Sequence, residues 1–356
     1  MSVDFHPLRV VEVSPLTDDS IAVTFDVPDE LADTFRYIPG QHVTLRAMIG
    51  GEDIRRSYSI CSNANGGKLR VGIKRLPGGA FSSFVTGDLA AGDVVEATAP
   101  SGEFTVVPDP AAARHRVAIA AGSGITPVLS LVATTLETER GSSWTLLLGN
   151  RTASSVMFLE ELEGLKDRYP DRFQLLHVLS REGSDLPLLT GRIDAGKIRF
   201  VHDRLLGGRS VDSWYLCGPY DLVMTARRAL GDLGVDDGSI HDELFFAGPV
   251  DPASLPPEPP PGEGSVDLTV ILDGRAVETR MTPETSILDA ALRVRPELPF
   301  SCKGGMCASC KGQIEEGDVR MTKNYALVDS ELEAGYVLTC QSHPLSDRIV
   351  VRYDHR

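Results

Sequence analysis

The sequence predicts a multidomain fold: an antiparallel β-barrel over residues 1–110, an α/β domain with a parallel sheet over 111–246, and a small α+β domain over 266–356. The length of 356 residues exceeds what one hydrophobic core usually serves. The hydrophobic pattern changes from short alternating segments to longer apolar ones near residue 110. The segment 247–265 holds seven prolines in nineteen residues and therefore predicts an extended linker that cannot bury a core.

The first region consists of short strand-like segments separated by Pro, Gly, Asp and Asn. No long helical pattern interrupts them, and this spacing is typical of a small antiparallel barrel. The predicted strands cover residues 8–13, 21–27, 42–47, 55–62, 68–75 and 93–100.

The second region alternates apolar runs with helical patterns. Such alternation predicts a parallel sheet covered by helices, with ligands bound at the carboxyl ends of its strands. The predicted strands are 116–121, 144–150, 173–180 and 213–218, and the predicted helices are 126–136, 155–169 and 220–233. In the last region the pattern predicts strands at 266–274, 275–281 and 348–354 and a helix at 286–294.

The composition is that of a soluble globular protein, with a net charge of −15 that disfavours binding to nucleic acid or to an anionic membrane. The first ten residues contain no apolar signal segment, so we expect a cytoplasmic location. One uncharged run, 117–136, is long enough to cross a bilayer, but Gly122, Gly124 and Pro127 interrupt it. A buried strand followed by a turn and a helix fits this run better.

Four of the six cysteines have the spacing of a metal centre. Cys302, Cys307 and Cys310 lie within nine residues, and Cys340 follows after 29 more. This spacing is that of a plant-type [2Fe–2S] cluster, in which four thiolates hold two irons. Glycines between the cysteines let the loop wrap tightly and bring its amides near the sulfurs. We therefore predict these four residues as cluster ligands.

A structural zinc site and disulfide pairs are the alternatives for the same cysteines. Zinc sites usually draw their ligands from two short knuckles, whereas this chain has a triplet and a single distant cysteine. A long chain without a signal segment also tends to keep its thiols reduced or bound to metal. The [2Fe–2S] interpretation is favoured, and such a cluster needs a source of single electrons upstream.

Two weak motifs lie in the predicted barrel. Residues 56–59 (RSYS) end a strand and offer a guanidinium, a flat ring and hydroxyl groups. Residues 78–83 (GGAFSS) form a glycine-rich turn whose amides can hold a phosphate. Each has a plain alternative: an aromatic residue packed in a barrel, and an ordinary hairpin turn.

Two further motifs follow buried strands of the predicted parallel sheet. Residues 122–127 (GSGITP) open a helix, with Thr126 suited to its cap and Pro127 to its first turn, and a helix start of this kind binds anions. Residues 217–219 (CGP) end another buried strand, where a buried thiol in a tight turn is the alternative.

Taken in order, RSYS, GGAFSS, GSGITP and CGP resemble the ferredoxin–NADP reductase family over residues 5–246, and residues 266–356 resemble a plant-type ferredoxin. The resemblance implies an FAD-binding β-barrel, an NAD(P)-binding α/β domain and a β-grasp ferredoxin domain. It implies that Tyr58, Ser59 and Cys217 are catalytic, with Ser59 near the flavin N5 and Cys217 beside the nicotinamide C4. It implies cofactor binding by Arg56, Ser57, Tyr58, Ser59, Gly79, Ala80, Phe81, Ser82, Gly124, Thr126, Pro127, Cys217, Gly218 and Pro219, with Phe245 or Phe246 near the flavin.

The choice of nucleotide depends on the ends of two neighbouring strands. In the resembled family, a Ser-Arg pair such as Ser180-Arg181 binds the 2′-phosphate of NADPH. The physical reason is a charge-assisted hydrogen bond from arginine to the phosphate. Asn150-Arg151 ends the preceding strand without the acidic residue that favours a free ribose hydroxyl. We therefore expect NADPH rather than NADH, with two exposed polar residues as the alternative.

The three predicted domains would bind cofactors that can pass electrons from one to the next. A nicotinamide gives two electrons at once and the cluster accepts one, so a flavin is needed between them. A flavin reductase fused to a C-terminal ferredoxin is the layout of many oxygenase reductases.

The stretches PGQHVTL, RRSYSIC, GNRT and CKGGMCASCKG resemble most the phenylacetyl-CoA epoxidase reductase family. This implies that the partner is a di-iron oxygenase of aerobic phenylacetate degradation. A reductase for a 3-ketosteroid 9α-hydroxylase or for an alkane or fatty-acyl hydroxylase is the alternative. An iron–sulfur sensor or zinc module with a vestigial barrel is a different class.

Overall fold

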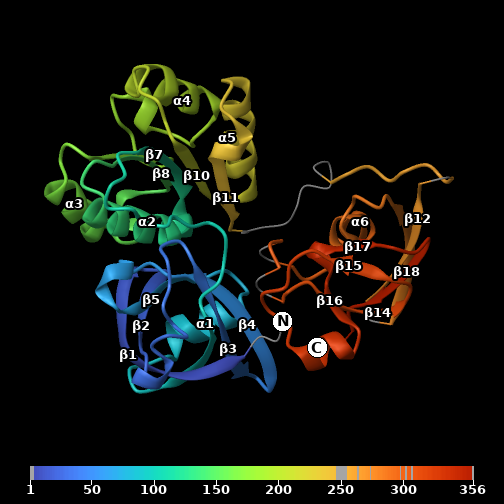
Figure 1. Cartoon of the computed structure of the whole chain (residues 1–356). Helices are drawn as coiled ribbons and strands as arrows, with labels where there is room; N and C mark the ends of the chain where they lie inside the picture. Colours follow the sequence, from blue (N-terminus) through green and yellow to red (C-terminus); the bar gives the residue numbers. More distant parts are fainter. Residues whose placement is uncertain are drawn as a thin grey trace. The chain divides into compact units, whose positions relative to one another are not determined.

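The structure is a computed structural model that describes residues 4–245, 255–262, 264–272, 274–296, 298–300, 303–305 and 308–354 (Figure 1). The chain forms two compact units. One comprises residues 1–6, 44–57 and 246–356, and the other comprises residues 7–43 and 58–245. The predicted limits of three domains and a linker stay a prediction.

The first sheet holds six strands in the order β4-β3-β6-β1-β2-β5. β2 pairs with β1 and with β5 in antiparallel register. An antiparallel bridge between Ile60 and Val71 joins the chain just after β4 to β5, which closes the sheet as a barrel. The strands are β1 (Phe5–Thr17), β2 (Ser20–Asp26), β3 (His42–Ile49), β4 (Glu52–Ser59), β5 (Leu69–Lys74) and β6 (Val94–Thr98), and a short helix, α1 (Ala80–Gly87), lies between β5 and β6.

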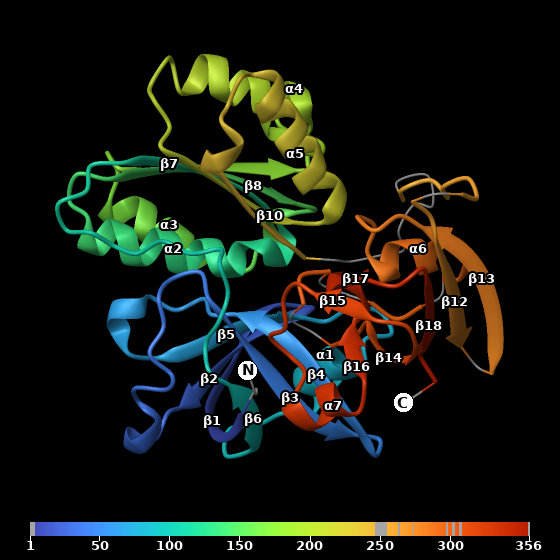
Figure 2. The same cartoon turned by 45° about the vertical axis from the view of Figure 1, so that its right-hand side comes forward.

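The second sheet is fully parallel, in the order β11-β10-β7-β8-β9. Figure 2 shows α2 and α3 on one face of this sheet and α4 and α5 on the other. Because both faces are covered, the central strands are largely buried; five of the seven residues of β7 are buried. The elements are β7 (His115–Ala121), α2 (Ile125–Thr138), β8 (Ser143–Asn150), α3 (Leu159–Arg168), β9 (Phe173–Leu179), α4 (Ala195–Phe200), β10 (Ser213–Gly218), α5 (Tyr220–Asp232) and β11 (Ile240–Leu244).

The third sheet has the order β13-β12-β18-β14-β16, and the buried residues of helix α6 join its core. β12 pairs with β18 in parallel and with β13 in antiparallel register. Ser286 caps α6 by accepting a hydrogen bond from the amide of Asp289 at 3.1 Å. The elements are β12 (Val266–Leu272), β13 (Arg275–Met281), α6 (Ile287–Val294), β14 (Lys311–Glu316), β15 (Val319–Met321), α7 (Asp329–Glu333), β16 (Tyr336–Leu338), β17 (Ser342–Pro344) and β18 (Arg348–Arg352).

Several elements differ from the sequence prediction. The predicted turn at 78–83 includes the start of helix α1, and α4 and β11 were not expected. The helix predicted from residue 155 begins only at Leu159, because Phe158 has a left-handed φ of 60° that a helix cannot contain. The run 117–136 forms β7, a short turn and α2 as predicted. No helix in the described parts of the chain combines the length and apolar character needed to span a bilayer.

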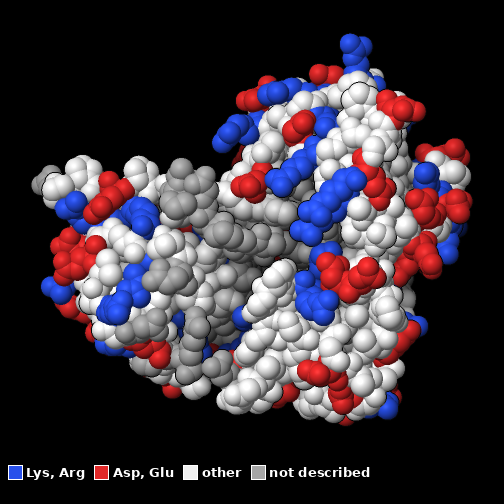
Figure 3. Space-filling view, turned by 180° about the vertical axis from the view of Figure 1, so that it is seen from behind, with Lys and Arg blue, Asp and Glu red and all other residues white. Residues whose placement is uncertain are grey.

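The surface carries charges of both signs. On the face shown in Figure 3, basic and acidic side chains are interspersed, so no large patch of one sign covers it. This pattern agrees with the ordinary surface that the composition predicts.

Candidate functional site

Two of the sequence motifs meet at the carboxyl ends of β7 and β10. A Cβ placed on Gly124 would lie 2.3 Å from the carbonyl oxygen of Cys217, so only glycine permits this approach. Gly218 has a φ of 151° and its Cα faces the backbone of Ala121. The structure therefore brings Gly124, Cys217 and Gly218 together, while Pro219 is the N-cap of α5.

The start of α2 differs in detail from the prediction. Gly124 is the N-cap, and Thr126 lies inside the first turn, where its hydroxyl donates to the carbonyl of Ser123 at 2.9 Å. The expectation that Thr126 caps the helix was therefore wrong, while Pro127 does lie in the first turn. The side chain of Thr126 also restricts position 72 of β5 to glycine. A Cβ on Gly72 would lie 2.7 Å from the methyl carbon of Thr126.

A buried carboxyl group connects the barrel motif to the CGP motif. Ser59, at the end of β4, donates from its hydroxyl to Oε2 of Glu243 at 3.1 Å, and both residues are buried. Glu243 lies on β11 directly beside Cys217 in the parallel register. The three polar side chains Ser59, Cys217 and Glu243 thus gather where strands of the barrel and of the parallel sheet end.

Burial controls the protonation of this group. It raises the pKa of Glu243 to about 7, and the hydrogen bond from Ser59 only partly opposes this rise. Burial also raises the pKa of Cys217 well above that of a free thiol, and the negative charges of Glu243 and Asp242 add to the effect. Cys217 is therefore a neutral thiol and not a thiolate nucleophile.

The residue that follows β11 lies close to the same strand ends. The amide of Phe245 donates to the carbonyl of Gly218 at 2.8 Å, and its ring is partly buried against the core of the parallel sheet. Phe246, the other residue expected near the flavin, lies outside the described residues. The structure thus places Phe245 beside the CGP motif.

The ring of Tyr58 and the first turn of α1 lie together. The ring centroids of Tyr58 and Phe81 are 5.8 Å apart. The hydroxyl of Ser82 accepts from the amide of Leu76 at 3.1 Å and donates to the carbonyl of Gly79 at 3.2 Å. This fixes the loop that precedes α1, and the amides of the first turn, which include that of exposed Ala80, have no intrahelical partners.

Arg56 and Ser57 lie on β4, one and two residues before Tyr58. Arg56 is partly buried, and its guanidinium donates to the carbonyl of Arg55 at 2.6 Å. The hydroxyl of Ser57 lies 2.8 Å from that of Thr44 on β3.

The predicted nucleotide-selecting residues lie at neighbouring strand ends. The amide of Ser180 donates to the carbonyl of Asn150 at 2.9 Å, and the amide of Arg181 donates to that of Arg151 at 2.8 Å. Ser180, Arg151 and Arg181 are exposed. The amide oxygen Oδ1 of Asn150 is buried without a hydrogen-bond partner. The structure thus places two cations beside each other after β8 and β9.

The cysteine region is described in part. Cys302 and Cys307 lie outside the described residues, while the side chains of Cys310 and Cys340 are buried. The hydroxyl of Thr339 donates to the backbone carbonyl of Cys310 at 2.8 Å. The side-chain amide of Gln341 donates to the backbone carbonyl of Lys303 at 2.7 Å. These bonds join the cysteine loop to the segment that carries Cys340.

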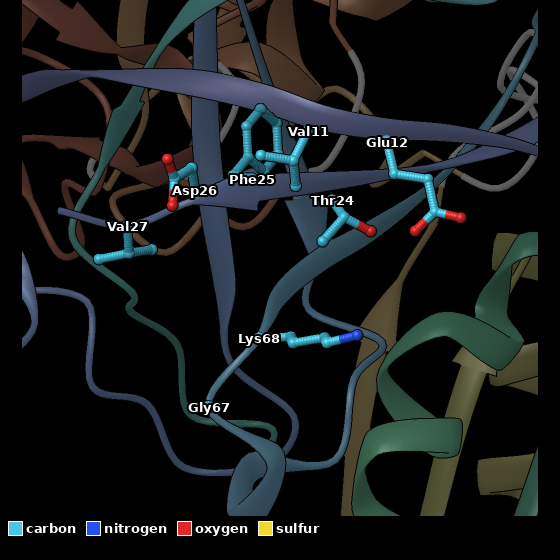
Figure 4. A pocket seen from close by; sticks show the side chains of 8 residues that line it. All are labelled: Val11, Glu12, Thr24, Phe25, Asp26, Val27, Gly67 and Lys68. Carbon is cyan, nitrogen blue, oxygen red and sulfur yellow. The ribbon is translucent and has the colours of Figure 1, made fainter. Parts of the chain in front are cut away.

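A surface pocket on β1, β2 and the loop before β5 contains none of the predicted site residues. Figure 4 shows its lining, which includes an exposed lysine and two acids but no aromatic group other than a strand phenylalanine. It is lined by Val11, Glu12, Thr24, Phe25, Asp26, Val27, Gly67 and Lys68.

Comparison with known protein families assigns each region. Residues 7–106 match the oxidoreductase FAD-binding domain, residues 118–228 the oxidoreductase NAD-binding domain, and residues 270–345 the 2Fe-2S iron-sulfur cluster binding domain. The chain is 42% identical to one of the subunits of the 1,2-phenylacetyl-CoA epoxidase of Escherichia coli (strain K12), over 98% of each protein. The chain belongs to the family of oxygenase reductase components.

Other members of this family and one solved structure agree. The chain is 33% identical to the ferredoxin reductase component of 3-ketosteroid-9-alpha-monooxygenase from Mycobacterium tuberculosis (strain ATCC 25618 / H37Rv), over 98% of this chain and 95% of the relative. Phthalate dioxygenase reductase has the same fold, with a TM-score of 0.54 and 22% identity over 98% of both chains. This oxygenase reductase therefore has a flavin barrel, a nicotinamide domain and a ferredoxin domain, as the sequence predicted.

The residues of this oxygenase reductase fit the cofactors that its domains imply. The first-turn amides of α1 suit a phosphate because a helix start binds anions, and the paired rings of Tyr58 and Phe81 offer an apolar surface. Cys310 and Cys340 are buried in the same core, and cysteine is the residue type that binds the iron of such a cluster. Gly305 in the same loop has a φ of 79°, and a Cβ there would lie 3.0 Å from the carbonyl of Lys323, so the loop needs glycine.

Sequence reasoning missed Glu243. The strand that contains it, IHDEL, was not singled out because its apolar residues are few. The signal that could have indicated Glu243 was an acidic residue within a short strand of the parallel sheet. Carboxyl groups are rarely buried unless they have a partner or a function.

Proposed function

We propose that this oxygenase reductase uses NADPH, FAD and a [2Fe–2S] cluster to deliver electrons to the di-iron oxygenase of a phenylacetyl-CoA epoxidase. The observation that carries the choice of partner is the 42% identity to the Escherichia coli epoxidase protein, against 33% for the ketosteroid relative at the same coverage of this chain. FAD, when bound, takes up two electrons together and releases them singly.

In this proposal the residues at the strand ends hold and orient the flavin and nicotinamide. Tyr58 covers a flat ring, and the first-turn amides of α1, with Arg56, hold the diphosphate. The close approach of Gly124 to the carbonyl of Cys217 brings the two motifs together at the strand ends, where they would lie against a second ring. Burial raises the pKa of Cys217 and keeps its thiol neutral, so this side chain would place no negative charge beside that ring.

Glu243 and Ser59 form a proton-holding pair in the same proposal. With a pKa of about 7, the carboxyl of Glu243 can keep or release a proton near neutral pH. The hydroxyl of Ser59, at 3.1 Å, is the atom through which that proton would be shared with the flavin edge. Four cysteines, Cys302, Cys307, Cys310 and Cys340, would hold the cluster.

The partner is tested by reconstituting the purified chain with FAD, iron and sulfide and supplying NADPH together with purified oxygenase components. We expect epoxidation of phenylacetyl-CoA with matched consumption of NADPH. The variant Cys310→Ser should lose transfer to the oxygenase but keep reduction of ferricyanide by NADPH, because the flavin lies before the cluster. Coupling to a 3-ketosteroid oxygenase but not to the epoxidase would contradict the proposed partner.

The nucleotide is tested by Arg181→Ala. Loss of a charge-assisted bond to a 2′-phosphate should lower kcat/KM for NADPH by about 10- to 100-fold and leave NADH almost unchanged. Arg168→Ala, at the exposed end of α3, is the matched control and should change neither. Equal losses for both nucleotides would remove the role of Arg181 in phosphate binding.

A further inference from the structure

Arg55, the residue directly before the RSYS motif, is a buried cation on β4. Its side chain is only 9% exposed, which is rare for arginine unless every donor has a partner. Alternate residues of a strand point to opposite faces, so Arg55 and Arg56 lie on different faces of β4. The proposed function uses Arg56 and leaves Arg55 unexplained.

The partners of Arg55 come from the ferredoxin domain as well as from its own strand. Nε and Nη2 donate to the two carboxylate oxygens of Asp53 at 3.2 and 2.7 Å. Nη1 donates to the carbonyl of Ala326 at 3.2 Å and to Oε2 of Glu331 at 2.9 Å, which lie 271 and 276 positions further along the chain. All three nitrogens are therefore used, and residues 44–57 of the barrel belong to the same compact unit as the ferredoxin domain.

Glu331 is itself fixed by several bonds. Its Oε1 accepts from Lys311 at 2.9 Å, and its Oε2 accepts from the amide of Val328 at 3.0 Å as well as from Arg55. Its side chain is 14% exposed. These bonds fix the position of the carboxylate on the short helix α7.

The contacted segments are close to the cluster loop in sequence and structure. Lys311 directly follows Cys310. Tyr325, the neighbour of Ala326, donates from its amide to the carbonyl of Gly305 at 3.0 Å. The strand that holds the flavin residues is therefore connected, through the single side chain of Arg55, to the residues around the cysteine loop (β4 and α7 are labelled in Figure 2).

We infer that Arg55 is a positioning residue that clamps the ferredoxin domain to the flavin strand and thereby sets the rate of electron transfer from flavin to cluster. This inference rests on the proposed function for the electron path. The rate measured for such a transfer is the intrinsic rate multiplied by the fraction of molecules in the clamped arrangement, so weakening the clamp lowers it. Uptake of electrons from NADPH does not depend on the clamp.

The first experiment uses Arg55→Ala and Glu331→Gln in the loaded, full-length protein and follows flavin and cluster absorbance by stopped flow after mixing with NADPH. Each variant should slow cluster reduction at least about tenfold, while flavin reduction and flavin content stay unchanged. High salt should slow cluster reduction in the wild type only slightly. Salt screens exposed ion pairs strongly and buried ones weakly, and the ion pair between Arg55 and Glu331 is buried.

Two controls and a double variant make the result specific. Arg9→Ala and Glu316→Gln remove members of exposed ion pairs on the barrel and on the ferredoxin domain and should change neither rate. The double variant Arg55→Ala with Glu331→Gln should reduce its cluster no more slowly than Arg55→Ala alone. Each change removes the same contact, the one between Arg55 and Glu331. Cluster reduction at the wild-type rate in both single variants, or additive losses in the double variant, would overturn the inference.

A second measurement needs no cofactor. Amide hydrogen exchange of residues 324–333 should be faster in Arg55→Ala than in the wild type, whereas Arg9→Ala should leave it unchanged. Equal exchange in Arg55→Ala and the wild type would overturn the clamp. If the wild-type protein fails to reduce its cluster with NADPH, the proposed function fails, and the exchange measurement still decides whether the clamp exists.

Discussion

Glu243 at the end of the parallel sheet and Glu331 in the ferredoxin domain are both largely shielded from water, yet their pKa values shift in opposite directions. Burial raises the pKa of Glu243 to about 7, with only the hydroxyl of Ser59 opposing it. Burial also acts on Glu331, but bonds from Lys311, from the Val328 amide and from Arg55 outweigh it and lower the pKa. The partners of a carboxyl group therefore decide whether it can exchange a proton or serves as a fixed charge.

The largest expected effect concerns the pH dependence of stability at Glu243. Because its pKa in the folded protein is raised from 4.5 to about 7, the stabilisation is full below pH 4.5 and is lost as the pH rises through 7. The loss is on the order of 3 kcal/mol, and Glu243→Gln should abolish it. Urea unfolding at pH 5 and pH 8, followed by tryptophan fluorescence, measures this change.

The fluorescence probe is specific for this region. Trp144 and Trp214 are the only two tryptophans of the chain, and both are buried in the parallel sheet. A wild-type protein that is equally stable at both pH values, or a Gln variant that keeps the full difference, would show that Glu243 is not the responsible group.

The next effect concerns Glu331. Glu331→Gln should cost about 1–2 kcal/mol at pH 7, because Arg55 and Lys311 lose a charged acceptor in a partly buried place. The measurement is chemical unfolding followed by circular dichroism, since residues 266–356 contain no tryptophan. Glu316→Gln, in an exposed ion pair, should stay within about 0.5 kcal/mol of the wild type.

The pH trend at Glu331 should be the reverse of that at Glu243. A lowered pKa gives stability that is present above the ordinary value of 4.5 and is lost as the pH falls through the lowered value. The wild type should therefore lose its advantage over Glu331→Gln in acid. An advantage that persists at the lowest pH would mean that neutral contacts, and not the ion pairs, stabilise this corner.

The smallest effect concerns Ser59→Ala. Removal of the one hydrogen bond that favours the ionised form should raise the pKa of Glu243 further, by roughly one unit or less. The infrared band of a protonated carboxyl group, followed against pH, measures it directly, with Glu243→Gln to assign the band. A pKa that falls in Ser59→Ala would contradict the hydrogen-bond direction seen in the structure.

The elements that the sequence predicted well are those with long local signals. The apolar runs of β7, β8, β9 and β10 and the helical pattern of α2 were visible because a covered parallel sheet needs continuous apolar strands. The sequence signals for Gly124 and Cys217 lie at one edge because Gly124 follows β7 and Cys217 lies at the end of β10, and the carboxyl ends of parallel strands meet at one edge.

Other features depend on contacts between distant segments and left no local pattern. α1 has eight residues, too few for a helical period to be distinct, and its preceding loop is fixed by the hydroxyl of Ser82. Glu243 looks like an ordinary strand residue until Ser59, 184 positions away, is beside it. Arg55 is next to a motif arginine, and only the fold reveals that it contacts Glu331.

The position of β18 has a consequence for the order of folding. This strand lies between β12 and β14, and its residue Ile349 pairs with Leu268, 81 positions earlier in the chain. Such a pairing closes late, because a long loop must be ordered before the contact forms. Val351 packs in the same core as Cys310 and Cys340, so the core around these two side chains is complete only when β18 is in place.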